Sequence, residues 1–338
     1  MQTEIEIAQS TPTAASIARL VEPQYDFGTV AEAEFIRRGY NQVYRLTFAD
    51  GRRVVARLCS QRPRGSANVL YEAAMLEHYA NSGCRVARCL PAADGSPAVY
   101  VQLPEGRRPV MLFENLEGEP TGDSAEDVDA FARALAELHI AGQSYAGPAS
   151  TYQLDIDFLL LRPLERLLRA PTMTAELRSR FESLGECLQR DIQAFGELSR
   201  IHCHGDAHGG NNHIVSDPQG RRVVSFFDFD DAGPGYLSYE LAVFPWNIHP
   251  RSPEAKFDGK TASLWLRFLS AYREVRQLQD IDLAAIGRFM AVRQLWFLGE
   301  FAGRTATLGS QVLPLGYLVR QAAMLKEWES LELPRYKV

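Results

Sequence analysis

The stretch that decides the fold runs from residue 201 to residue 242 and reads IHCHGDAHGGNNHIVSDPQGRRVVSFFDFDDAGPGYLSYELA. It holds two strand-like runs, Ile214–Val215 and Arg222–Phe227, separated by the turn sequence Asp217–Gly220. The two ends of a hairpin lie side by side, so polar residues before the first strand and after the second should converge. The stretch therefore predicts one cluster of polar side chains at the open end of a hairpin.

Three of these polar residues have the types that phosphoryl transfer requires. Asp206 would accept the proton of an attacking hydroxyl, as the catalytic base. Asn211 and Asp228 would hold Mg²⁺, which prefers hard oxygen ligands and completes its shell with water and phosphate oxygens. Since residue type, order and spacing all match, the sequence predicts a phosphotransferase that uses ATP and Mg²⁺.

The segments HGDAHGGNN (204–212) and FFDFDDAG (226–233) resemble the HGD-x-H-x-G-N and IDFDDAG motifs of the aminoglycoside phosphotransferase/choline kinase superfamily. The resemblance extends over most of the chain. The C-terminal helical part is more similar to the bacterial stress-response kinase and type II homoserine kinase branches. The resemblance implies a protein-kinase-like fold and transfer of the γ-phosphoryl group of MgATP to a hydroxyl.

Further site residues follow from the resemblance. It implies that His204 supports the catalytic loop, that His208 lies near the substrate or the base, and that Asp230 assists the metal ligands. Glu72 matches the Glu of the N-lobe helix, and Glu114 to Leu116 fall at the hinge that would bind adenine.

Two features depart from the protein-kinase pattern. The residue aligned with the phosphate-binding Lys of the third strand is Arg57, which is always charged and can bind phosphate bidentately. We expect Arg57 to pair with Glu72. The nucleotide loop, residues 38–42, holds one glycine, and we expect the Asn41 side chain to help it hold the phosphates.

The residue patterns along the chain predict an α+β fold of two unequal lobes. Residues 34–58 read as strands that turn at Asp50-Gly51, residues 66–82 as a helix, and 97–103 and 108–113 as further strands. We therefore expect an N-terminal nucleotide-binding lobe over residues 1–115 and a mainly helical catalytic and acceptor-binding lobe over 116–338. Helices in the second lobe are predicted at 128–140, 159–168, 175–195, 261–275, 283–301 and 315–331.

Composition excludes several other classes of protein. A chain of 338 residues with 46% hydrophobic residues can bury a large core without disulfides. A formal charge of −6 argues against a nucleic-acid binder, and we find neither a secretory signal nor an apolar run of about 20 residues. Five irregularly spaced cysteines are typical of reduced thiols, so we expect a cytoplasmic protein.

Two alternatives stay open at this stage. His204, Asp206 and His208 have residue types that bind Zn²⁺, so a metal-dependent hydrolase is a second hypothesis. The stress-response branch leaves a Ser/Thr protein kinase as a third.

The acceptor is a small hydroxyl compound in our first interpretation: an amino alcohol, an amino sugar or aminoglycoside, or a homoserine-like molecule. Acidic residues near the site would favour a cationic acceptor, and Trp246 would border its pocket. The sequence decides neither the acceptor, nor ATP against GTP, nor the oligomeric state.

Overall fold

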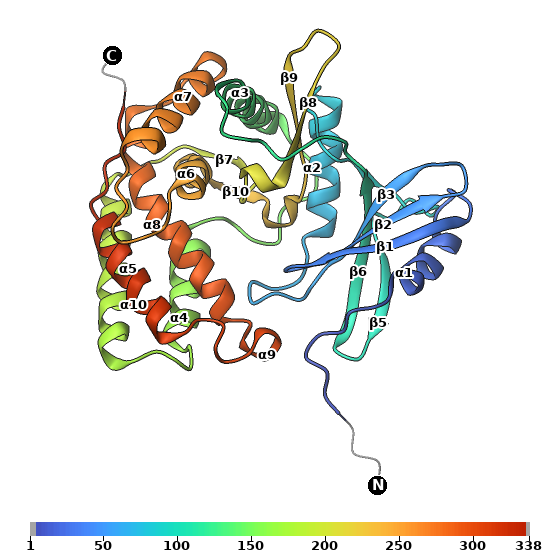
Figure 1. The fold of residues 1–338 in the computed structure, drawn as a ribbon, viewed down its shortest axis with the longest axis horizontal. Coiled ribbons are helices and arrows are strands. Elements are labelled where there is room, and N and C mark those ends of the chain that lie inside the picture. The colour runs from blue at the N-terminus through green and yellow to red at the C-terminus, as the bar shows by residue number, and fades with distance from the viewer. Residues whose placement is uncertain (1–4, 336–338) are drawn as a thin grey trace.

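The computed structural model describes residues 5–335, which form two unequal lobes (Figure 1). The smaller lobe is built on a six-stranded antiparallel sheet with the order β1-β2-β3-β6-β4, in which β5 also pairs with β6. Gly51 adopts a positive φ of 87° in the predicted Asp-Gly turn between β2 and β3. The strands are β1 (Val30–Arg38), β2 (Gln42–Phe48), β3 (Arg53–Leu58), β4 (Cys89–Leu90), β5 (Val99–Leu103) and β6 (Gly106–Glu114).

Two helices accompany this sheet. The helix α1 (Ala14–Val21) packs Ile17 and Val21 into a small core beneath β2 and β3. The helix α2 (Val69–Asn81) lies between the sheet and the larger lobe (Figure 1). Its buried residues include Glu72, whose carboxylate faces β3. The expected sheet with one embedded helix is thus confirmed.

The larger lobe is mainly helical, as predicted. A short π-helical turn, Asp157–Leu161, leads into α4. The sequence predicted one continuous helix here, over residues 159–168. The helices are α3 (Ala125–Ala141), α4 (Arg162–Leu168), α5 (Ala175–Ala194), α6 (Leu237–Ile248), α7 (Gly259–Val275), α8 (Asp280–Ala302), α9 (Thr305–Leu308) and α10 (Leu315–Trp328).

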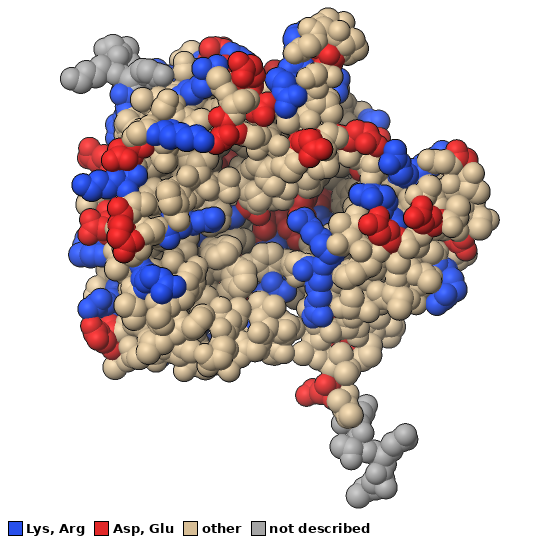
Figure 2. All heavy atoms as spheres, in the orientation of Figure 1, with Lys and Arg blue, Asp and Glu red and all other residues tan. Residues whose placement is uncertain are grey.

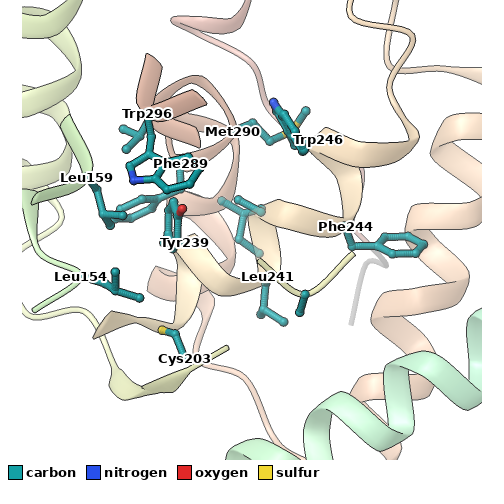
Figure 3. Close-up of a cluster of buried hydrophobic side chains, with 14 of the residues drawn as sticks. Leu154, Leu159, Cys203, Tyr239, Leu241, Phe244, Trp246, Phe289, Met290 and Trp296 are labelled. Atoms are coloured by element: carbon teal, nitrogen blue, oxygen red, sulfur yellow. The ribbon is translucent and has the colours of Figure 1, made fainter. Parts of the chain in front are cut away.

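Helix α6 was not predicted from the sequence. Almost all of its residues are buried, so it lacks the alternation of apolar and polar faces that marks a surface helix. It also contains Pro245, which normally interrupts a helix. Its packing against α8 forms the centre of the larger core, where aromatic and aliphatic side chains from both helices meet (Figure 3).

Two small strand pairs carry the decisive stretch. β8 (Asn212–Ser216) and β9 (Arg222–Phe226) form the predicted hairpin. β7 (Arg200–Cys203) and β10 (Gly233–Tyr236) pair antiparallel beside it. The segments that precede β8 and follow β9 are therefore held close together at the face of the large lobe. Among residues 5–335, no helix is both long enough and apolar enough to cross a membrane.

A loop between β3 and α2 reaches from the small lobe into the large one (Figure 1). Arg62 lies 3.3 Å from Asp230, 3.1 Å from Asp231 and 3.2 Å from Glu300. Arg64 lies 3.3 Å from Asp230 and also pairs with Asp231. Both arginine side chains are almost completely buried. We call Arg62 and Arg64 the arginine latch, because they join the lobes by buried ion pairs.

Replacing Arg62 with Met should destabilise the fold strongly. The change leaves Asp230, Asp231 and Glu300 buried with less countercharge, and breaking a buried pair from one side costs about 3–5 kcal/mol. Urea unfolding measures this loss. Arg53→Met is the control, since Arg53 pairs with Glu117 in an exposed position, and such pairs contribute about 1 kcal/mol or less. Equal losses in the two variants would contradict the latch.

Candidate active site

The turn after β7 holds Asp206 at the edge of the large lobe. Gly205 before it has a φ of 84°, and a Cβ on Gly205 would lie 2.3 Å from the carbonyl oxygen of Asp231. Only glycine fits this close approach, which explains the Gly in the HGD sequence. The Asn211 Nδ2 donates to the carbonyl oxygen of Asp206 at 3.0 Å and to its Oδ2 at 3.2 Å. The spacing of these two residues thus brings their side chains into contact, as expected.

Asp228 lies two residues after the end of β9, next to this pair. The Phe227 backbone N–H donates to the Asn211 carbonyl oxygen at 3.0 Å, which ties the two ends of the hairpin together. Asp228 itself has a left-handed backbone with a φ of 65°, an uncommon conformation for a non-glycine residue. Burial and the neighbouring Asp230 carboxylate raise the pKa of Asp228, against the opposing effect of Arg57.

Arg57 joins β3 and α2 to Asp228 across the cleft between the lobes. Its Nη1 donates to Glu72 at 2.8 Å and to Asp228 at 3.2 Å, and its Nη2 donates to Glu72 at 2.5 Å. The guanidinium also lies 4.8 Å from the centre of the Phe113 ring. The expected pair with Glu72 is therefore present, and its two hydrogen bonds point a fixed positive charge at Asp228.

A cavity of about 500 Å³ opens between the two lobes beside Asp228. A volume in this range is typical of sites for small molecules. The predicted hinge residues Glu114 and Leu116 line it. Figure 2 shows acidic side chains at the floor of the hollow between the lobes, with basic side chains beside them. Other lining residues include Ile36, Arg37, Val43, Val55, Arg57, Phe113, Asn115, His213 and Phe227.

The donor set of Asn211 and Asp228 fits Mg²⁺. Asn211 uses Nδ2 for its bonds to Asp206, so its Oδ1 is the atom left for a cation. An amide oxygen and a carboxylate beside open space are ligands that Mg²⁺ accepts, with water and phosphate oxygens completing the shell.

The two histidines near Asp206 do not form a zinc site. The His204 Nε2 lies 3.0 Å from the Phe227 carbonyl oxygen, and its Nδ1 accepts from the Asp206 backbone N–H. The His208 Nδ1 accepts from the Gly210 backbone N–H at 2.9 Å. Within residues 5–335, no three His, Cys, Asp or Glu side chains are placed to share a metal. This geometry argues against the hydrolase hypothesis and fits His204 as a support of the loop.

Comparison with known proteins identifies the family. The sequence model of the phosphotransferase enzyme family matches residues 32–278. The chain belongs to this family. An uncharacterised protein of Deinococcus radiodurans is 35% identical over 94% of this chain and 90% of its own length.

Two solved structures share the fold. A microcompartment-associated aminopropanol kinase has a TM-score of 0.76 at 21% identity, over 95% of this chain and all of its own. The amicoumacin kinase hAmiN, in complex with AMP-PNP, Ca²⁺ and Ami, has a TM-score of 0.73 at 20% identity, over 93% of this chain and 92% of its own. The expected bilobal, protein-kinase-like fold is therefore confirmed.

Asn41 and Asp230 of this phosphotransferase bind each other. The Asn41 Nδ2 donates to Asp230 at 2.7 Å, and its Oδ1 accepts from the Ser60 backbone N–H at 2.9 Å. Asp230 is engaged by the arginine latch, and Arg64 and Arg62 lower its pKa although burial acts in the opposite direction. Both side chains thus have partners within the protein, and their expected roles at the phosphates and the metal stay predictions.

The acidic residues of the phosphotransferase also fail to support a cationic acceptor. Asp230 and Asp231 pair with the latch. Glu240 accepts from the backbone N–H groups of His204 at 3.0 Å and Gly205 at 2.9 Å. Because each carboxylate already has partners in the protein, these residues give no support for an amine-bearing acceptor.

Trp246 is a core residue and does not border an open pocket. The residue is 4% exposed, and its Nε1 donates to the Gln294 side chain at 2.7 Å. Its ring lies against the guanidinium groups of Arg293 and Arg251 (4.8 and 4.5 Å). The position was misjudged because α6, on which Trp246 lies, was not predicted.

Sequence reasoning missed one residue that contacts Asp206 directly. Arg293, in the middle of α8, pairs with the Asp206 carboxylate. Burial acts to raise the pKa of Asp206, but Arg293 and His208 outweigh it and the pKa falls to about 2. An arginine among mostly apolar residues of α8 was the sequence signal, and such a residue does not identify its partner.

Substituting Arg57 with Lys should weaken nucleotide binding by about tenfold. Lys keeps the positive charge, but it cannot make the two parallel hydrogen bonds to Glu72 that orient the Arg57 side chain. Calorimetric titration with AMP-PNP and Mg²⁺ measures the affinity. Arg45→Lys is the control, because Arg45 lines the same cavity but pairs with Glu34 in an exposed position. Unchanged affinity for Arg57→Lys would exclude a role in holding the phosphates.

Proposed function

We propose that this phosphotransferase moves the γ-phosphoryl group of MgATP to a hydroxyl of a small molecule. The observation that carries the proposal is the meeting of Asp206, Asn211 and Asp228 beside the cavity between the lobes, opposite Arg57. Each of these residues has the chemical type that its role in phosphoryl transfer demands.

The cavity holds the nucleotide in this proposal. Backbone groups from Glu114 to Leu116 bind adenine, and Arg57, aimed by Glu72, binds the phosphates. Asn211 and Asp228 hold Mg²⁺, which neutralises charge on the phosphates when it is bound. Arg57 then contacts both the phosphates and Asp228, so it offsets negative charge on both sides of the cleft.

Asp206 acts on the acceptor. Its carboxylate orients the acceptor hydroxyl toward the γ-phosphorus. As the new oxygen–phosphorus bond forms, the bond to the β,γ-bridging oxygen breaks and ADP leaves with that electron pair. The hydroxyl proton passes to Asp206. Because the pKa of Asp206 is about 2, we infer that the proton moves late and that orienting the hydroxyl is its main contribution.

The acceptor in our proposal is an amino alcohol, an amino sugar or a homoserine-like compound. The support comes from the relatives, which are described as aminopropanol and amicoumacin kinases, and those descriptions favour small molecules over protein Ser/Thr. The carboxylates of Asp230, Asp231 and Glu240 give no support, since they are paired within the protein.

We further propose the division of the chain into lobes at 1–115 and 116–338, and a cytoplasmic location. The last strand of the sheet ends at Glu114, and α3 begins at Ala125. All five cysteines are free, as expected for a reducing compartment.

Replacing Asp206 with Asn should reduce acceptor-dependent ADP formation by at least about 100-fold. The amide has one acceptor oxygen and an NH₂ donor in place of two acceptor oxygens, so it orients the hydroxyl less well, and it cannot take the proton. Binding of MgAMP-PNP should change little, since Asp206 faces the acceptor. Coupled-enzyme ADP detection and calorimetry measure the two properties. Undiminished turnover would remove Asp206 from its proposed role.

Asp217→Asn is the matched control for this experiment. Asp217 lies in the turn of the same hairpin and pairs with the exposed Arg221. Its replacement should leave turnover within about twofold of the parent.

A further inference from the structure

Arg293 is buried in the core of the large lobe, and both of its Nη atoms have hydrogen-bond partners. Its side chain is 2% exposed. Its Nη1 donates to the Gly205 carbonyl oxygen at 3.2 Å and to the Tyr239 hydroxyl at 3.0 Å, and its Nη2 donates to Asp206 Oδ1. The guanidinium therefore binds both the backbone before Asp206 and the carboxylate of Asp206.

Two tryptophans hold the guanidinium in place. Its central carbon lies 4.8 Å from the Trp246 ring centre and 4.4 Å from the Trp296 ring centre. Stacking of this kind suits the planar guanidinium and not a lysine ammonium. Trp246, Trp296 and Tyr239 lie on α6 and α8 in the packed centre of the lobe (Figure 3), so the arginine has little freedom to move.

The carboxylate oxygens of Asp206 have different surroundings. Oδ1 accepts from Arg293, whereas Oδ2 accepts from Asn211 at 3.2 Å and lies 3.6 Å from His208 Nε2. Asp206 is 21% exposed, in contrast to the buried Arg293. Arg293 thus holds Oδ1 from within the core, whereas Oδ2 lies on the more exposed side of the carboxylate.

We propose that Arg293 is a positioning residue for the phosphoryl transfer: it fixes the orientation of the Asp206 carboxylate so that Oδ2 meets the acceptor hydroxyl. This inference rests on the proposed function of the same site. Trp246 then serves the reaction indirectly, by stacking on Arg293.

Loss of Arg293 should lower kcat and leave nucleotide binding intact. We expect Arg293→Ala to reduce kcat by about 100-fold, the size of effect that a small misplacement of a reacting group produces. The KM for ATP should stay within about twofold, because Arg293 does not face the cavity lined by Arg57 and Leu116.

Chemical rescue is the deciding measurement. Guanidinium ion at millimolar concentration should enter the space that the side chain leaves in Arg293→Ala. It should raise the kcat of this variant at least about tenfold, and tetramethylammonium should not. Arg288→Ala is the matched control, because Arg288 precedes Arg293 on the same helix and lies 3.6 Å from Asp191. Its kcat should stay within about twofold and should not respond to guanidinium.

Two results would overturn the inference. One is a folded Arg293→Ala variant whose kcat equals that of the parent. The other is a loss of kcat that guanidinium does not restore. If Arg293→Ala does not fold, Arg293→Lys replaces it, and a kcat close to the parent value would then contradict a role that depends on the planar guanidinium.

A double-mutant cycle measured by thermal stability does not depend on catalytic activity. It therefore distinguishes failure of this inference from failure of the proposed function. Melting temperatures are compared for Arg293→Met, Asp206→Asn and the double variant. Because removing one partner leaves the other buried and unpaired, the double variant should lose less stability than the two single losses added together. Additive losses would overturn the pairing itself, whereas a wild-type protein without acceptor-dependent ADP formation would overturn only the proposed function.

Discussion

The contact between the arginine latch and Asp230 and Asp231 is the constraint on which the rest of the structure depends. Arg62 and Arg64 come from the small lobe, and the two carboxylates belong to the segment that follows β9 in the large lobe. All four side chains are buried, so the charges are costly unless they stay together. The latch therefore fixes the distance between the lobes, and with it the shape of the cavity between them.

The same segment carries Asp228, the proposed metal ligand. Asp228 lies two positions before Asp230 and is in contact with Arg57 at 3.2 Å. The small lobe thus holds this segment at two places, through Arg57 and through the latch. Nucleotide binding and the contact between the lobes are consequently coupled, because both depend on the position of residues 228–231. The first residue of this segment, Asp228, has a strained left-handed backbone.

Local signals could be read from the sequence, and contacts between distant residues could not. The hairpin, the Asn211 and Asp228 positions and the Arg57–Glu72 pair follow from short motifs whose chemistry is specific. The arginine latch and the Arg293 contact join residues more than eighty positions apart, and no local pattern selects such partners. Trp246 was misplaced because it lies on α6, and α6 was missed because a buried helix has no polar face.

The most direct test of the account is to find where the phosphoryl group goes. The protein is incubated with Mg²⁺ and ATP labelled at the γ-phosphate, together with a panel of amino alcohols, amino sugars and homoserine. Small molecules and protein are then separated and counted. The account predicts label on the hydroxyl of a small acceptor, with one ADP formed for each label transferred. Label that appears only on protein, or only as inorganic phosphate, would contradict it.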